Sequence, residues 1–204
     1  MLSKQYRTYY GKYSDKLEEL LQVMINELNS INYKLYEQNG HKPCEHILSR
    51  IKDPKSLKSK LERFELETSV ENALYHMHDI VGVRIVTHFV GDVYDVLEEI
   101  KLSNKWSVVK IKDYIKNSKP NGYRSLHMLV SLPFGVGKIE NINTEIQLRT
   151  IAQDTWAALE HQIKYKKKVK DINLITAELK RCADELASVD MSMQSIRDVI
   201  NSQQ

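Results

Sequence analysis

Residues that crosslink or sharply constrain a backbone are scarce in this chain of 204 residues, which contains two cysteines, four prolines and seven glycines. Cys44 and Cys182 lie far apart and outside any metal-ligand spacing, which argues against a disulfide framework and against a zinc site. We expect both to be ordinary reduced residues. A G-x-x-x-x-G-K-[ST] loop is also absent from the sequence, so a bound triphosphate would be held mainly by side chains.

Long hydrophobic runs are absent as well. No apolar segment approaches the roughly 18 residues that a membrane-spanning helix needs, and the N-terminus, Met1 to Arg7, lacks the apolar segment of a secretory signal. We therefore expect a cytoplasmic protein that does not bind a membrane. A chain with 42% hydrophobic residues can bury one core together with helical appendages.

Charge is nearly balanced but unevenly placed. The net charge of +3 is too small for a protein that wraps bulk nucleic acid. The cations gather in the segments 50–63, 101–124 and 164–170. Clusters of this kind suit a small polyanion, such as a nucleotide or a short piece of RNA. For the third cluster we favour a solvated helix end, because the helix dipole attracts cations to a C-terminus.

Apolar residues repeat at intervals of four and three near both ends of the chain. The first repeat predicts a helix with Ser14 as its N-cap and Gly40 at its end, and the second predicts a helix over 175–200. The two apolar seams could pack on the core or on each other, but patterns of this length favour self-association. The seams consist of Leu17, Leu21, Met24, Leu28, Ile31 and Leu35, and of Ile175, Leu179, Cys182, Leu186, Val189, Met193, Ile196 and Ile200.

Between these helices the pattern changes to that of a β-sheet. Runs rich in β-branched residues predict four strands, the first of them buried and central. The order of the elements indicates an α/β or α+β fold with a mixed sheet. The strands are expected at 79–90, 106–111, 125–132, where Pro133 ends the strand, and 142–150, with one helix capped by Asp92 and another over 152–163.

The segment from Lys112 to His127 combines four cations, a turn, an aromatic ring and a histidine directly before an apolar run. Cations make charge-assisted contacts with phosphate. Asn121-Gly122 is typical of a turn, and Tyr123 offers a flat surface on which a base can stack. The segment therefore predicts a loop that holds a phosphorylated, ring-bearing molecule, with a solvated lysine-rich hairpin as the alternative.

Two acidic residues on separate predicted strands are candidates for metal binding. Alternation along 143–149 places Glu145, Gln147 and Arg149 on one strand face, where they must meet water or a polar ligand. A solvent-facing edge strand is the alternative. Asp79 opens the other strong strand, and two carboxylates with no thiol nearby would suit Mg²⁺. The sequence alone does not place them together.

A second cationic site is predicted upstream. Pro54 indicates a helix start, so Lys60 and Arg63 would share one helix face. Arg50 and Lys52 would share one side of an extended segment. Taken alone, this segment is more typical of a solvated helix face than of a binding site.

Six segments in order resemble the motifs of RelA/SpoT-type (p)ppGpp synthetase domains, over residues 40–168. In length the chain resembles the single-domain small alarmone synthetases, especially the RelQ type. The resemblance implies a nucleotidyltransferase-like core of the α/β (α+β) class at 40–168, a helical region at 1–39 and an oligomerisation helix at 169–204. The segments are Arg50-x-Lys52, Lys60-Leu-x-Arg63, His78-Asp-Ile-Val-Gly-Val-Arg84, Lys112 to His127, Glu145-Ile-Gln-Leu-Arg-Thr150 and Trp156-x-x-Leu-Glu-His161.

This resemblance implies transfer of the β,γ-pyrophosphate of ATP to the ribose 3′-hydroxyl of GDP or GTP, with GMP as a further candidate acceptor. It assigns Asp79 and Glu145 to catalysis and to Mg²⁺, and Glu145 also to activation of the 3′-hydroxyl. On the ATP side it implies Arg50 and Arg84 around adenine, and Lys52, Lys60 and Arg63 on the phosphates. On the acceptor side it implies Tyr123 on guanine, with Lys112, Lys119, Asn121, His127 and Gln147 around the nucleotide.

The resemblance also implies partners. These are a homotetramer built through the terminal helices, (p)ppGpp as an allosteric ligand and single-stranded RNA as a further candidate. The alternative from another functional class is a catalytically silent nucleotide-binding or RNA-binding regulator with the same fold. The acids at positions 79 and 145 argue against it.

Overall fold

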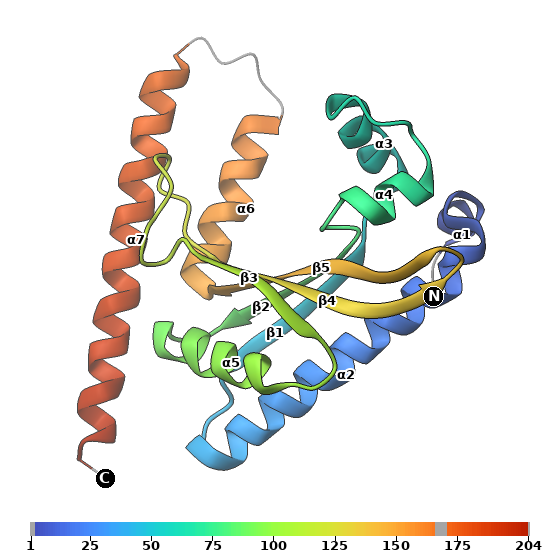
Figure 1. The fold of residues 1–204 in the computed structure, drawn as a ribbon. Coiled ribbons are helices and arrows are strands. Elements are labelled where there is room, and N and C mark those ends of the chain that lie inside the picture. The colour runs from blue at the N-terminus through green and yellow to red at the C-terminus, as the bar shows by residue number, and fades with distance from the viewer. Residues whose placement is uncertain (1–2, 166–170, 204) are drawn as a thin grey trace.

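The computed structural model describes residues 3–165 and 171–203. Within these residues five strands form one mixed sheet, flanked by helices (Figure 1). This confirms the predicted fold class. The elements are α1 (Lys4–Tyr10), α2 (Ser14–Asn39), β1 (Cys44–Ile51), α3 (Pro54–Arg63), α4 (Val70–His76), β2 (Val81–Thr87), α5 (Val90–Leu102), β3 (Ser107–Asp113), β4 (Leu126–Val136), β5 (Ile139–Thr150), α6 (Ile151–Tyr165) and α7 (Ile172–Asn201).

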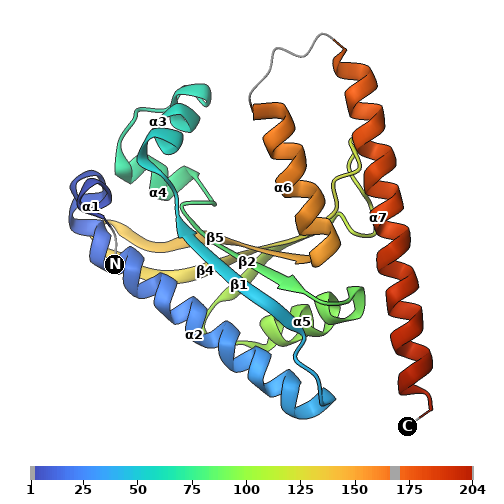
Figure 2. The same cartoon turned by 180° about the vertical axis from the view of Figure 1, so that it is seen from behind.

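The sheet has the strand order β1-β2-β5-β4-β3. Strands β2 and β5 are parallel, and the other neighbouring pairs are antiparallel. Helices α2 and α5 cover one face of the sheet. Helices α3 and α4 stand at one end of the opposite face and α6 at the other end. Helix α7 runs past that end of the sheet from α6 to α5, as both views show (Figure 1, Figure 2).

The apolar seam of α2 packs on the sheet of its own chain. Leu17, Met24 and Leu28 are at most 1% exposed, and the hydroxyl of Thr144 in β5 donates to the sulfur of Met24. Of the two alternatives that the sequence left open for this seam, packing on the core is the one that the structure shows. Leu20 takes a fully buried place beside the predicted Leu21, which is partly buried.

The ends of α2 follow from local chemistry. Gly40 ends the helix at a φ of +71°, a conformation that glycine adopts without a steric penalty. Ser14 is the first helical residue and not a side-chain cap, since its hydroxyl donates to the carbonyl of Arg7, 3.4 Å away. The additional helix α1 precedes it.

The apolar seam of α7 is only half packed. Leu179 and Ala183 are buried, whereas Val189, Met193 and Ile196 are more than half exposed. The predicted seam is therefore continuous in sequence but divided in space, with its first half on the body of the protein and its second half facing solvent.

Strand β4 continues through Pro133 to Val136, which corrects the expectation that proline ends it. Proline lacks the N–H group of a ladder hydrogen bond. On one side β4 pairs with β3, which begins at Ser107 opposite Ser131. At Pro133, β4 therefore pairs only with β5, on its other side. The missing donor therefore breaks no ladder bond on the open side.

Asp92 is the third residue of α5 and not its N-cap, which corrects the prediction; its carboxylate accepts from the backbone N–H of Phe89, the residue before the helix, at 3.1 Å. In α3, Asp53 caps the helix by accepting from the N–H of Ser56 at 3.0 Å. The segment 166–170 and the side chains at 164 and 165 lie outside the described residues, and so does the predicted domain boundary at 168. Among the described helices, none is both long and apolar enough to cross a bilayer.

Candidate active site

Polar side chains line up across the sheet because strand register places them opposite one another. Arg84 of β2 pairs with Gln147 of β5, which pairs with His127 of β4, which pairs with Lys112 of β3. Paired residues of neighbouring strands share one face of a sheet. The structure therefore brings residues from four strands into one row.

The neighbouring row forms the floor of a pocket. Arg50 of β1 is paired with Gly82 of β2, which is paired with Glu145 of β5. Gly82 has no side chain, which leaves space between the guanidinium and the carboxylate. The resulting pocket has a volume of about 180 Å³ and is lined by Leu48, Ser49, Arg50, Asp79, Gly82, Val83, Arg84, Glu145 and Gln147.

Asp79 and Glu145 line this same pocket. Asp79 lies just before β2, and Glu145 lies in the parallel neighbour β5. The sequence left open whether these two carboxylates approach each other. Their common pocket answers that question, and the negative charge of Asp79 acts on the Glu145 carboxylate.

Two lysines neutralise Asp79. Lys52 donates to its Oδ2 at 2.6 Å, and Lys60 donates to its Oδ1 at 2.8 Å. Burial raises the pKa of Asp79, but the hydrogen bonds and charges of the two lysines outweigh this, so the pKa lies below its ordinary value. Tyr10 fixes the position of Lys52, since its hydroxyl donates to the Lys52 carbonyl at 2.7 Å.

Glu145 is held by two hydrogen-bond partners, a histidine and a glutamine. Nδ1 of His127 lies 2.8 Å from its Oε1, and Nε2 of Gln147 donates to its Oε2 at 2.7 Å. Burial raises the pKa of Glu145, and the hydrogen bond and charge of His127, with the bond from Gln147, lower it further than burial raises it. The result is an ionised carboxylate in a half-buried place.

The contacts continue from Glu145 to an aromatic ring. Nε2 of His127 lies 2.7 Å from the hydroxyl of Tyr123, and that hydroxyl accepts from Nη2 of Arg149 at 2.6 Å. A guanidinium can only donate. The Tyr123 O–H can therefore donate to Nε2 while the Nδ1–H of His127 donates to Glu145, so each group in this series has a hydrogen-bond partner.

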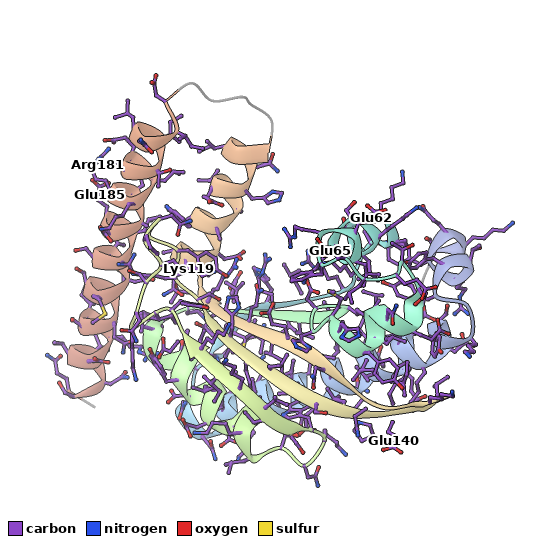
Figure 3. All side chains as sticks on the ribbon, turned by 45° about the horizontal axis from the view of Figure 1, so that its top comes forward. Glu62, Glu65, Lys119, Glu140, Arg181 and Glu185 are labelled. Atoms are coloured by element: carbon purple, nitrogen blue, oxygen red, sulfur yellow. The ribbon has the colours of Figure 1, made fainter. Side chains whose placement is uncertain are left out.

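The ring of Tyr123 sits among cations and other rings. Nζ of Lys119 lies 4.7 Å from its centroid and the guanidinium carbon of Arg149 lies 5.2 Å from it. Lys119 is also 4.7 Å from the ring centroid of Tyr114, so this lysine contacts both rings. Figure 3 shows Lys119 on the loop between helix α7 and the sheet.

Sequence reasoning missed Asp154. This residue, in the first turn of α6, accepts from Arg149 at 3.0 Å and pairs with Arg84 at 3.1 Å. Burial lowers the pKa of Arg84, and the charge of Arg149 adds to this effect. The sequence could have indicated Asp154 as an acidic residue at the start of the helix that follows a polar strand. Only the folded chain shows that it pairs with Arg84 and Arg149.

Other predicted residues lie outside the pocket. Arg63 is exposed at the end of α3, with its guanidinium 5.5 Å from the ring centroid of Phe64. Figure 3 shows Glu62 and Glu65 near the same end of the helix. Asn121 serves the turn, since its Oδ1 accepts from the N–H of Tyr123 at 3.2 Å.

The pocket offers a metal ion two carboxylates. No group of three or more histidine, cysteine, aspartate or glutamate side chains suited to a metal occurs in the described parts of the chain. Mg²⁺ is commonly held by one or two protein carboxylates, with water and substrate phosphates completing its shell. Asp79 and Glu145 therefore fit Mg²⁺ in the presence of a phosphorylated ligand, and they do not form an all-protein cage.

Known proteins share this architecture. The family described as "Region found in RelA / SpoT proteins" matches residues 49–170. The chain is 38% identical over 188 residues to the GTP pyrophosphokinase YwaC of Bacillus subtilis, covering 92% of this chain and 86% of that protein. It is 31% identical over 211 residues to YjbM, the GTP pyrophosphokinase of the same organism, covering 100% of this chain and 94% of that protein.

Solved structures agree with these relatives. The small alarmone synthetase 2 of B. subtilis has a TM-score of 0.77 at 39% identity, over 90% of this chain and 96% of that chain. The small alarmone synthetase 1 of B. subtilis bound to its product pppGpp has a TM-score of 0.77 at 30% identity, over 98% of this chain and 100% of that chain. The protein thus belongs to the RelA/SpoT family, in its group of small alarmone synthetases.

Proposed function

We propose that this protein is a GTP pyrophosphokinase that transfers the β,γ-pyrophosphate of ATP to the ribose 3′-hydroxyl of GDP or GTP and so makes (p)ppGpp, the alarmone of the stringent response. One observation carries the proposal. Asp79 and Glu145 share a pocket, with lysines on the side of Asp79 and the Tyr123–His127 pair on the side of Glu145. The names of the relatives support it.

The donor binds on the side of Asp79. Lys52 and Lys60, which neutralise Asp79, carry the charges that the phosphates of ATP require. Arg50 and Arg84 line the same pocket with planar guanidinium groups, which suit the faces of adenine. Arg63 lies outside the pocket and would reach the phosphates only by a change of side-chain conformation. A similar structure, small alarmone synthetase 1 of B. subtilis, is bound to AMPCPP.

The acceptor binds on the side of Glu145. Tyr123 gives guanine a ring on which to stack, and Lys119 beside that ring supplies charge for the acceptor phosphates. His127 and Gln147 lie in the row next to Glu145 and fix its orientation. Lys112 stands at the exposed end of that row, and Asn121 shapes the turn that carries Tyr123.

The reaction joins two polyanions that repel each other. The 3′-oxygen of the acceptor attacks the β-phosphorus of ATP, the bond from that phosphorus to the α,β-bridging oxygen breaks, and AMP leaves. Alignment and charge neutralisation supply most of the rate under these conditions. Asp79 and Glu145 would hold Mg²⁺, which would supply further neutralisation of phosphate charge when bound.

Glu145 accepts the proton of the 3′-hydroxyl in this account. Because its pKa is lowered, it is a weak base at neutral pH, and its main contribution is to hold the hydroxyl in line. The bonds from His127 and Gln147 keep the carboxylate ionised and fixed, which is the state that this role requires.

An assay that offers ATP with GMP, GDP or GTP in turn, with and without Mg²⁺, tests the proposal. We expect AMP and a 3′-pyrophosphorylated product with GDP and GTP, and product formation that requires the metal. The rival is a silent regulator that binds nucleotides without turnover. Nucleotide binding by calorimetry without any AMP release would favour that rival.

The exposed second half of α7 supports self-association. Val189, Met193, Ile196 and Ile200 present an apolar face to solvent. The homotetramer, with α7 as its oligomerisation helix, predicts a mass four times that of the chain by light scattering. A cytoplasmic location and the RelQ type are part of the same proposal. Allosteric binding of (p)ppGpp and binding of single-stranded RNA stay predictions from the resemblance alone.

A further inference from the structure

Helix α7 runs beside the loop that carries Tyr123, as both ribbon views show (Figure 1, Figure 2). The loop and the helix meet at Gly122. This residue is buried and has a φ of +88°, and a Cβ added to it would lie 2.6 Å from the Cβ of Ala183 and 3.1 Å from the Cα of Lys180. The loop backbone therefore touches the helix at the residue next to the proposed stacking ring.

One side chain fastens this contact. Nη2 of Arg124 donates to Oδ1 of Asp184 in α7 at 2.9 Å. Nη1 of the same guanidinium donates to the carbonyl of Gly122 at 3.1 Å and to that of Ala183 at 3.3 Å. The Arg124 side chain is 18% exposed, so these bonds are partly shielded from water. A single residue thus joins the loop to the helix on both sides of the contact.

The ring of Tyr123 packs on α6 and α7, apart from the main core. Trp156, Leu179 and Ala183 form a small apolar cluster of their own, and Tyr123 packs against it. Nε1 of Trp156 donates to the carbonyl of Leu179 at 2.8 Å, which fixes α6 to α7. The proposed guanine platform is therefore mounted on the C-terminal helices.

The donor side has a different foundation. Leu57 and Leu61 of α3, and Ile80 after Asp79, belong to the main core together with α2 and the sheet. The two halves of the proposed pocket are accordingly built on two apolar clusters. Residues 179–184 of α7 therefore contact the loop with Tyr123, whereas Asp79 and its two lysines adjoin elements of the main core.

Further contacts fix residues 190–197 of α7 to the rest of the protein. Asp190 accepts from the hydroxyl of Thr150 at 2.6 Å, at the end of the strand that carries Glu145. Gln194 accepts from the N–H of Gly91 at 2.8 Å, and Arg197 pairs with buried Asp92. The helix is therefore attached both to the start of α5 and to the acceptor loop.

We propose that Arg124 and Asp184 are positioning residues for the acceptor, through which helix α7 sets the place of Tyr123 and Lys119 and thereby the affinity for the guanosine nucleotide, independently of ATP. This inference rests on the proposed function, which puts the acceptor at Tyr123. It assigns α7 a task within one subunit, in addition to the proposed self-association.

Steady-state kinetics of Asp184→Asn, with each substrate varied in turn, test the inference. The amide keeps an acceptor oxygen but loses the charge that strengthens the bonds from Arg124 and Lys180, which predicts an acceptor KM raised by about tenfold. The KM for ATP should stay within twofold of wild type. Asp184→Glu keeps the carboxylate and should restore most of the acceptor affinity, which a general loss of structure would not do.

Glu185→Gln is the matched control. Glu185 is the next residue of the same helix, and its ion pair with Arg181 faces away from the sheet (Figure 3). We expect unchanged kinetic constants in this variant. Equal changes in both KM values for Asp184→Asn, or no change in either, would overturn the inference.

Equilibrium binding of GDP, measured by calorimetry, separates this inference from the proposed function. If wild type binds GDP but produces no AMP from ATP, the proposed function fails. The ratio of GDP affinities between wild type and Asp184→Asn then still tests the positioning role of Arg124 and Asp184. An unchanged GDP affinity in Asp184→Asn, alongside normal turnover of wild type, would refute only the positioning role of Arg124 and Asp184. A wild type that does not bind GDP would refute both.

Discussion

The carboxylate of Glu145 and the hydroxyl of Tyr123 lie on opposite sides of one imidazole. Nδ1 of His127 is 2.8 Å from the carboxylate and Nε2 is 2.7 Å from the hydroxyl. The proposed catalytic acid and the proposed guanine platform are therefore mechanically linked. A base that binds at Tyr123 can therefore affect the position of Glu145 through the imidazole of His127.

His127→Ala should disconnect the two groups. Burial then acts on Glu145 without the opposing contribution of His127, so the pKa of Glu145 rises. Since the ionised carboxylate is the active form, the acidic limb of the pH profile of kcat should move to higher pH. We also expect kcat at neutral pH to fall by about 10²-fold, within the range for loss of a positioned acid–base group. An acidic limb at the wild-type position would contradict this role of His127.

The ring and the hydroxyl of Tyr123 should contribute separately, the ring to acceptor binding and the hydroxyl to kcat. Tyr123→Ala removes the ring and should raise the acceptor KM by about 5-fold to 100-fold, as expected for base stacking worth about 1–3 kcal/mol. Tyr123→Phe keeps the ring and removes only the hydroxyl between Arg149 and His127. It should lower kcat with little effect on the acceptor KM. Identical kinetic constants for the two variants would show that the ring itself does not bind the base.

Asp79 should contribute to acid sensitivity of the fold. Its folded-state pKa lies below the unfolded value, so it stabilises the folded state above the unfolded pKa, near 3.9, and loses this contribution as pH falls through the folded pKa. Urea unfolding between pH 2.5 and 6 should show a steeper loss of stability in wild type than in Asp79→Asn. Parallel curves for the two proteins would show that the ion pairs with Lys52 and Lys60 do not persist in solution.

Asp154→Asn should destabilise the protein, because it leaves buried Arg149 without its ion-pair partner and Arg84 beside it. We expect a loss of about 2 kcal/mol in the free energy of unfolding, measured with urea. Asp15→Asn is the control, since its ion pair with Arg7 is exposed and its loss should leave the free energy of unfolding nearly unchanged. The same loss in both variants would exclude a special role for Asp154.

The sequence predicted helices from the spacing of apolar residues and strands from β-branched residues. Helices α2, α6 and α7 were anticipated in the first way and the interior strand β2 in the second. Strand β1 was not anticipated beyond its last residues, because its side chains are mostly exposed and carry no apolar alternation. Helix α4, with seven residues, is too short for periodicity to indicate it.

The site was anticipated where chemistry is local to a segment and missed where it depends on packing. The polar face of β5 and the turn at Asn121-Gly122 were read from residue type and alternation. That Gly122 is required by contact with α7, and that Asp154 joins two arginines, depends on how distant elements pack. Helical spacing also could not show that Lys60 turns toward Asp79 while Arg63, one turn later, faces solvent.

Product formation by Glu145→Gln and Asp79→Asn is the most direct measurement of the central claim, that these two carboxylates act together on ATP and a guanosine nucleotide. Each purified variant, shown to be folded by circular dichroism, is mixed with ATP, GDP and Mg²⁺, and the nucleotides are separated by anion-exchange chromatography. We predict AMP and ppGpp from wild type and neither product from either variant. Full activity in one of the variants, or a wild type that leaves ATP intact with every guanosine phosphate, would contradict the account.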